Sequence, residues 1–175
     1  MNILIIISGI AYTLLSLLVG VISIFLTFRF LRFFHKSMIN DAVLNNDNIA
    51  LSLYISASIF SVAWVMKGAI EPAITAFNLV LRDPSSVLID YLIIFGIILF
   101  QLVGSGILSF CFILIGLWIF TKLTKDIQEM EEIKRNNIAL GILLSTLIIV
   151  LVLFIQPGIS MIMDGMIPFP QIGIK

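Results

Sequence analysis

The chain has 175 residues, of which 61% are hydrophobic and only 11% are charged, and its formal net charge is zero. Soluble globular domains carry about 25% charged residues, so this composition excludes that class and indicates one compact membrane-embedded domain. The zero net charge leaves no basic surplus for binding nucleic acid. The single cysteine, Cys111, and the single histidine, His35, exclude an internal disulfide and a metal site made of Cys and His.

Four apolar runs are long enough to cross a bilayer, which takes about 20 mostly apolar residues. Because backbone polar groups cannot stay unpaired in hydrocarbon, each run is predicted to be a helix. In chain order the predicted spans cover residues 3–28, 49–66, 91–120 and 138–155. The first run has no basic residues before it and is too long for a cleaved signal peptide, so we expect it to be retained. The predicted fold class is all-α with four transmembrane helices.

The basic residues predict the orientation of these spans. Three of the ten lysines and arginines follow the first span and four follow the third, namely Arg29, Arg32, Lys36, Lys122, Lys125, Lys134 and Arg135. The other side has only Lys67, Arg82 and Lys175. Basic loops favour the cytoplasmic side, so both termini are predicted to lie outside the cytoplasm.

A short sequence, Asn-Ile-Ala-Leu, occurs twice, at residues 48–51 and 137–140. The segments "LLVGVISIF" at 17–25 and "QLVGSGILSF" at 101–110 are also alike. These pairs predict two units, approximately 1–86 and 87–175, each with two spans. Because each unit crosses the bilayer twice, the two repeats are parallel and related by a pseudo-two-fold axis along the membrane normal. They differ in this from the inverted repeats of many transporters.

The repeated asparagines, Asn48 and Asn137, begin the second helix of each unit. Asparagine is a strong N-cap residue, so both are predicted to cap these helices; a ligand-binding role is the alternative. Small residues four apart follow at matching positions, in the pairs Ser52/Ser56 and Gly141/Ser145. Such pairs allow helix backbones to approach closely. The two helices that carry them contact each other or the equivalent helix of another subunit, and contact with another subunit predicts a homo-oligomer.

Several polar residues in or near the spans are candidates for a solute pathway. Gln101, Ser105 and Ser109 form one stripe at helical spacing, which lines a path or hydrogen-bonds a neighbouring helix. Lys67 and Glu71, four residues apart, lie at the outer boundary, where they form an ion pair at the mouth of a pathway or an interfacial anchor. The candidate pathway therefore consists of Gln101, Ser105, Lys67 and Glu71.

Two segments between or after the spans also have a predicted place. Residues 123–133 alternate apolar and acidic side chains at helical spacing, which predicts an amphipathic helix on the cytoplasmic membrane surface or a docking site for a partner. The Pro-interrupted C-terminal segment from Gln156, and the segment from Lys67 to Pro84, are expected to lie along the outer surface or to dip back into the bilayer.

The sequence contains no phosphate-binding glycine loop, no cluster of metal ligands and no Ser-His-Asp set. We therefore expect no catalytic residues, no cofactor and no enzymatic activity. The expected partners are the lipid bilayer, further copies of the chain, and a cytoplasmic or membrane protein.

The segment "EEIKRNNIALGILLSTLIIVLVLFIQPGI" resembles the signature of a small bacterial family, often called YjfL-like, with the domain name domain of unknown function three-fifty. The family pattern is Glu-Ile, two variable residues, then Gly-Asn-Val-Ala-x-Ala. Here it matches Glu132-Ile133, Asn137, Ile138-Ala139 and Gly141. Asn136 replaces the usual glycine, so the turn before the cap is expected to differ. In the first copy, Asn48, Ile49, Ala50 and Ser52 match.

This resemblance implies a multi-span protein of the bacterial inner membrane without a settled activity. It also implies partners, because members of the family are encoded beside envelope-stress or polyamine-related proteins. The predicted function is a non-catalytic, oligomerising membrane component or scaffold of an envelope or membrane-stress system. The alternative is a subunit of an ion channel or small-solute transporter.

Overall fold

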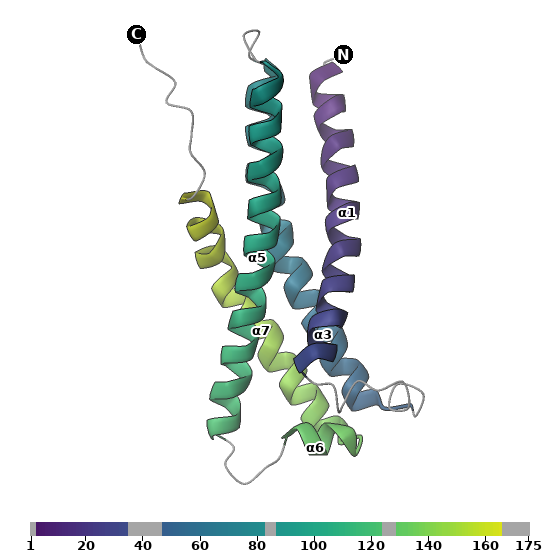
Figure 1. The fold of residues 1–175 in the computed structure, drawn as a ribbon. Helices are drawn as coiled ribbons and strands as arrows, with labels where there is room; N and C mark the ends of the chain where they lie inside the picture. Colours follow the sequence, from purple (N-terminus) through teal and green to yellow (C-terminus); the bar gives the residue numbers. More distant parts are fainter. Residues whose placement is uncertain (1–2, 35–46, 83–86, 124–128, 166–175) are drawn as a thin grey trace.

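The computed structural model describes residues 3–34, 47–82, 87–123 and 129–165, and every regular element in them is a helix. Figure 1 shows their arrangement. The helices are α1 (Ile3–Phe34), α3 (Ile49–Gly68), α4 (Ile70–Arg82), α5 (Leu88–Leu123), α6 (Glu129–Lys134) and α7 (Ile138–Gly165).

Among the described residues, four helices are long and apolar enough to cross a membrane, over Ile6–Phe34, Ile49–Pro72, Leu88–Lys122 and Ile138–Gly165. The predicted fold class, an all-α protein with four membrane-spanning helices, is therefore confirmed. Two of the predicted starts, Ile49 and Ile138, are also the first residues of their helices. Both starts follow an asparagine, which fixes the first turn locally.

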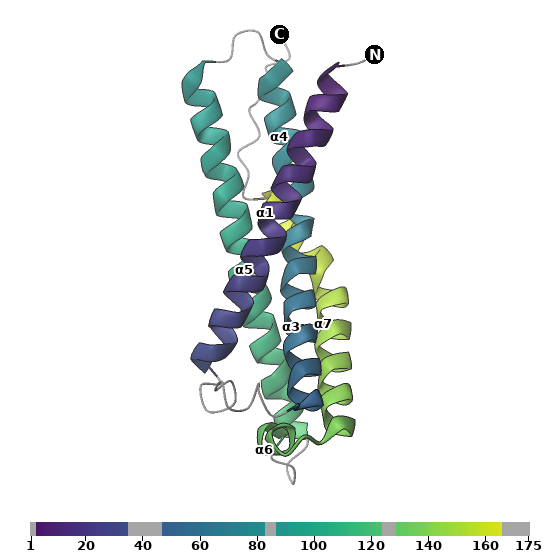
Figure 2. The same cartoon turned by 90° about the vertical axis from the view of Figure 1, so that its right-hand side faces the viewer.

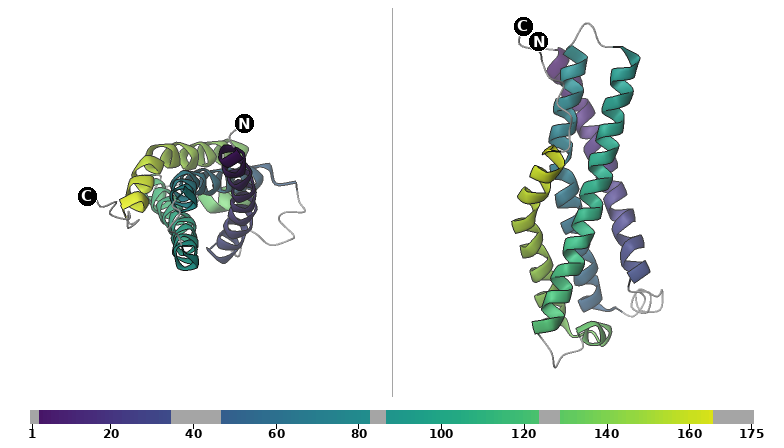
Figure 3. Two further views of the ribbon diagram at one scale, coloured as in Figure 1. Left: turned by 90° about the horizontal axis from the view of Figure 1, so that it is seen from above. Right: turned by 60° about the vertical axis from the view of Figure 1, so that its left-hand side comes forward.

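The helices extend beyond several predicted ends. α1 continues through Arg29 and Arg32 to Phe34, and α7 does not stop at Pro157 but runs on to Gly165. Proline removes one helical hydrogen bond, yet a membrane helix tolerates this because its neighbours and local adjustments satisfy the freed carbonyl. Figure 3 shows on the right that α7 is bent. Residues 166–175 of the predicted C-terminal segment lie outside the described residues.

The segment after α3 also departs from its prediction. A C-cap at Ala69 ends α3, and α4 begins at once with Ile70. Rather than lying along the outer surface or turning back, α4 continues upward from α3 beside α1 (Figure 2) and packs on α5 and α1. Its Asn78 accepts a hydrogen bond from the Ser8 hydroxyl of α1 at 2.9 Å.

The core lies where α3, α5 and α7 meet. α3 and α7 share the most extensive interface, and α5 packs on both. α1 packs on α3 and α4 and has little contact with α5. Buried side chains in the core include Tyr54, Val62 and Met66 of α3, Leu102 and Ile113 of α5, and Leu144 and Ile148 of α7. The short α6 lies across the end of the bundle where α3 and α7 begin (Figures 1 and 3).

Candidate functional site: an asparagine cluster and a buried polar stripe

Asn48 joins two distant parts of the chain at the start of α3. Its Oδ1 accepts a hydrogen bond from the Leu51 N–H at 2.8 Å, which caps α3. Its Nδ2 donates to the carbonyl oxygens of Ile133 at 2.8 Å and Lys134 at 3.2 Å, at the end of α6. Asn48 is only 6% exposed, and these three bonds satisfy the polar groups of its side-chain amide inside the protein.

Asn136 makes a reciprocal connection from the other half of the chain. Its Oδ1 accepts a hydrogen bond from the Ala50 N–H at 3.1 Å, so α3 is capped by two asparagines, one from each half. The Asn136 N–H donates to the Ile133 carbonyl and the Asn137 N–H to the Glu132 carbonyl, both at 3.0 Å. These two bonds form a Schellman motif that ends α6 directly before α7.

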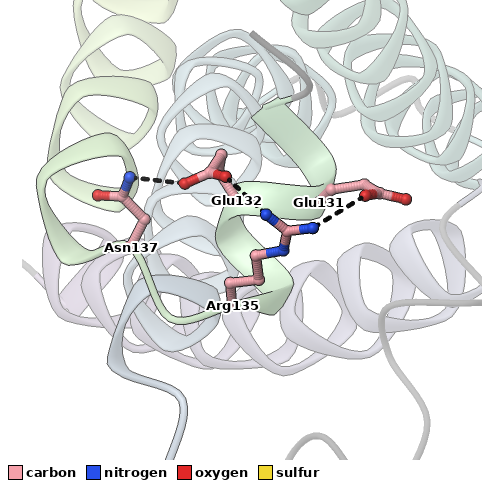
Figure 4. A network of polar contacts seen from close by, with 4 residues as sticks. All are labelled: Glu131, Glu132, Arg135 and Asn137. Carbon is pink, nitrogen blue, oxygen red and sulfur yellow. Dashed lines mark hydrogen bonds and ion pairs between the residues drawn. The ribbon is translucent and has the colours of Figure 1, made fainter.

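Asn137 caps α7 in a more exposed setting. Its Oδ1 accepts from the Leu140 N–H at 3.3 Å, and its Nδ2 donates to Glu132 Oε2 at 2.9 Å. Figure 4 shows Glu132 between Asn137 and Arg135, whose guanidinium lies 3.5 Å from Glu132 and 3.9 Å from Glu131. Ion pairs this exposed contribute little stability, so the hydrogen bond of Asn137 is the specific element of the network.

The residue before each cap adopts the left-handed backbone conformation. Asp47 has φ 47° and Asn136 has φ 62°, and no other described non-glycine residue has a positive φ. These two residues are separated by the same 89 positions as Asn48 and Asn137. Asparagine and aspartate tolerate this region better than other L-residues, so Asn136 fits a turn in which the family pattern has glycine. A left-handed residue followed by an asparagine cap thus occurs at both positions.

The small residues divide between an interior and an exterior face. A Cβ atom on Gly141 would lie 2.7 Å from the Ala50 Cα, so α7 approaches the backbone of α3 here. Gly141 and Ser145 are buried, and the Ser145 hydroxyl donates to the Gly141 carbonyl. Ser52 and Ser56, in contrast, are exposed. The residue of α3 that meets Gly141 is therefore Ala50, two positions before the predicted pair begins.

The polar stripe of α5 points into the bundle. Gln101 is 1% exposed, Ser105 1% and Ser109 0%. Ser105 donates to the Leu102 carbonyl, whereas neither amide atom of Gln101 nor the Ser109 hydroxyl has a hydrogen-bond partner among the described residues. On α3, the buried Ser61 hydroxyl also has no hydrogen-bond partner among the described residues. The stripe is thus buried among helices, but two of its three side chains, Gln101 and Ser109, have no hydrogen bond within the described residues.

The other two candidate pathway residues, Lys67 and Glu71, lie apart from this stripe. Both are exposed, and within the described part of the chain they form no ion pair. Lys67 Nζ instead lies 5.4 Å from the ring centroid of Trp64, a cation–π contact. The expected ion pair needs one continuous helix, and the C-cap at Ala69 interrupts it between the two residues.

The predicted amphipathic helix is short in the structure. Only Glu129–Lys134 form α6, and residues 124–128 lie outside the described residues. Ile133 is fully buried, as the apolar face requires, but Glu129 is only 3% exposed and does not lie on the solvent side with Glu131. The sequence also gave no signal that Asn136 would cap α3, because that bond joins residues 86 positions apart.

Taken together, these features define a multi-pass helical membrane protein. In the described ranges, no three His, Cys, Asp or Glu side chains come together in a way that could hold a metal ion. The model of the family Domain of Unknown Function (DUF350) matches residues 94–169, from α5 through α7. The predicted resemblance to this family is therefore confirmed for residues 94–169. A second, tandem copy in the first half and the YjfL-like name stay predictions. Neither the curated proteins nor the solved structures gave a match to the chain.

Proposed function

We propose that this protein is a non-catalytic component of the bacterial inner membrane that assembles with copies of itself and serves as a scaffold for other envelope proteins. Its two units would be parallel repeats of one two-helix element, with both termini outside the cytoplasm. The end of the bundle that carries α6 would then face the cytoplasm and its protein partners. The left-handed residue and asparagine cap that recur at Asp47–Asn48 and Asn136–Asn137 support the repeat.

The outward face of α3 carries this proposal. α3 packs most closely within the bundle, yet Ser52 and Ser56 stay exposed on the face away from Ala50. Small residues four apart on a lipid-facing helix let a second helix approach closely, and they are typical of helix dimers in membranes. We infer that a second copy of α3 packs there.

Cross-linking tests this interface. In a Cys111→Ser background, Ser56→Cys should give a disulfide-linked dimer in native membranes, because a two-fold contact brings equivalent residues together. Ser56→Leu should lower the dimer fraction measured by size exclusion with light scattering in mild detergent. Thr146→Leu is the matched control, since Thr146 is an exposed hydroxyl residue on α7. A monomeric mass for the unsubstituted protein in several mild detergents would contradict the proposal.

One observation favours a second function, an ion channel or small-solute transporter subunit. Both amide atoms of Gln101 are buried without a partner in the described part of the chain. An unpaired amide in an apolar environment costs several kcal/mol, so this position favours a bound polar species such as a water molecule or an ion. Ser105 and Ser109 continue the polar stripe one and two turns further along α5.

Flux through liposomes that contain only the purified protein separates the two functions. A conducting protein should lose or change its flux with Gln101→Leu and keep it with Gly158→Ala, a change at an exposed site with no atom within 4 Å of the added Cβ. If folded, inserted protein shows no flux for ions or small polar solutes, the channel function is excluded and the scaffold is retained.

A further inference from the structure

A groove separates the second half of α1 from α5. In the described part of the chain, Phe30 of α1 stacks on Phe110 of α5, with ring centroids 3.9 Å apart. Around this pair lies an open volume of about 1110 Å³. Its walls are mainly apolar, with Leu26, Phe33 and Phe34 on α1 and Val103, Ile107 and Leu114 on α5. Such a volume is slightly larger than the sites of drug-sized ligands, which enclose about 300–1,000 Å³.

Two cations lie at the edge of this apolar groove. Arg29 and Arg32 both line it, and both are exposed. Arg29 forms no ion pair with a carboxylate in the described part of the chain. The groove therefore combines a long apolar surface with a positive charge, which is the complement of an anionic amphiphile.

The helices are staggered, so that α1 ends away from the ends of its neighbours. Phe110 lies 13 residues before Leu123, so the stacked pair is about 20 Å from the end of α5. Gly106, four residues before Phe110, lies beside Met66 of α3. Met66 comes 17 residues after Ile49, where α3 begins, so the level of Phe110 is about 20 Å from that start of α3. Figure 2 shows α1 ending before the level of α6.

A bilayer matched to α3 has a hydrocarbon core of about 30 Å, and the basic end of α1 would then lie inside it. Charged side chains at such a depth are costly unless they reach headgroups or meet a counter-charge. A lipid phosphate drawn into the groove supplies that charge to Arg29, which forms no ion pair in the described part of the chain.

We propose that the groove between α1 and α5 is a binding site for one anionic phospholipid, with its phosphate at Arg29 and Arg32 and an acyl chain along Val103 and Ile107. A second copy of the chain fits less well, because a two-fold contact centred here would bring the arginines of both copies together. This inference is independent of the scaffold function, whose contact lies on α3.

Cys111 provides a probe inside the site. It is the chain's only cysteine, it is exposed, and it lines the groove. The rate at which a small uncharged maleimide alkylates Cys111 in the detergent-solubilised full chain therefore reports occupancy. Phosphatidylglycerol and phosphatidylcholine with the same acyl chains are added at equal mole fractions of the micelle.

We expect phosphatidylglycerol to slow alkylation much more than phosphatidylcholine. Arg29→Gln or Arg32→Gln should each weaken the apparent affinity for phosphatidylglycerol about fivefold, and the double variant should abolish the difference between the lipids. Arg29→Lys keeps a charge and should retain most of the protection. Arg135→Gln is the matched control, because Arg135 is an exposed arginine outside the groove, and it should change nothing.

The comparison of the two lipids uses the unsubstituted protein. This test therefore remains interpretable even where a substitution prevents folding. Equal protection by both lipids would overturn the proposal, because the groove would then be ordinary lipid-facing surface. Protection that increases with protein concentration and not with lipid would also overturn it and assign the groove to a second copy. Unchanged alkylation with either lipid would contradict any occupancy of the site.

Discussion

Gly141 of α7 lies directly against Ala50 of α3, so closely that a Cβ atom at residue 141 would be 2.7 Å from the Ala50 Cα and 2.9 Å from its Cβ. Neither of these atoms is the end of a flexible side chain, so the contact cannot be relieved by a rotamer change. The distance between the two helices at their starts is therefore set by the absence of a side chain at residue 141.

Gly141→Ala should accordingly destabilise the protein by about 1–3 kcal/mol, because one helix must shift to admit the methyl group. Gly158→Ala in the same helix is the matched control, since nothing lies within 4 Å of its Cβ position. That change should be neutral or stabilising by up to about 1 kcal/mol through helix propensity. Unfolding in mixed micelles of mild detergent and dodecyl sulfate measures both, and equal stability of the two variants would refute this contact.

Asn48 should be more sensitive to substitution than its counterpart Asn137. Asn48→Ala removes a cap and two bonds to the end of α6, and it leaves the carbonyls of Ile133 and Lys134 without this donor. A loss of about 2–4 kcal/mol is expected, against about 1 kcal/mol for Asn137→Ala at an exposed cap. The same unfolding titration compares the two, and a larger loss at Asn137 would contradict the bridging role of Asn48.

The left-handed turn at Asn136 predicts an order of stabilities. Asn136→Gly keeps the φ of 62° without strain but loses the bond to the Ala50 N–H, whereas Asn136→Ala loses that bond and strains the backbone. The alanine variant should therefore be less stable than the glycine variant by about 1–2 kcal/mol. If alanine is tolerated as well as glycine, the turn does not hold this conformation in the membrane.

Gln101→Leu should raise the stability of the folded protein. The leucine side chain is of similar size and removes two buried polar atoms that have no partner among the described residues. A gain of about 1–2 kcal/mol is expected, provided that the amide is not solvated in the folded state. A loss of stability would show that Gln101 has a partner in the bilayer: a bound water or ion would strengthen the channel alternative, and a second chain would strengthen the scaffold.

The starts of α3 and α7 were predictable because a cap is a local feature: an asparagine followed by an apolar run specifies the first turn wherever the helix packs. The face that each helix presents to its neighbour was not predictable from a local pattern. Ser52 and Ala50 differ by two positions, which is more than half a turn, and only the interface with Gly141 selects between them. Likewise, Pro157 has the sequence of a helix end, but in this bundle α7 continues through it.

For the candidate site, the sequence identified the polar stripe at Gln101 but not its burial without partners. It placed Lys67 and Glu71 on one helix face, and the break at Ala69 separated them. Bonds such as those from Asn48 to the end of α6 join residues 85 and 86 positions apart. No local pattern specifies such pairs, since they depend on how the two halves of the chain meet.

This long-range closure has a consequence for biogenesis. The start of α3 receives half of its cap from Asn136 and anchors the end of α6 through Asn48, and both partners are synthesised long after α3 has left the ribosome. α3 must therefore remain in the membrane with its Ala50 face against lipid, or against another protein that binds it transiently, until α7 is inserted. A nascent chain that stops before residue 134 cannot close this end of the bundle, so α6 and the turn before α7 complete the start of α3.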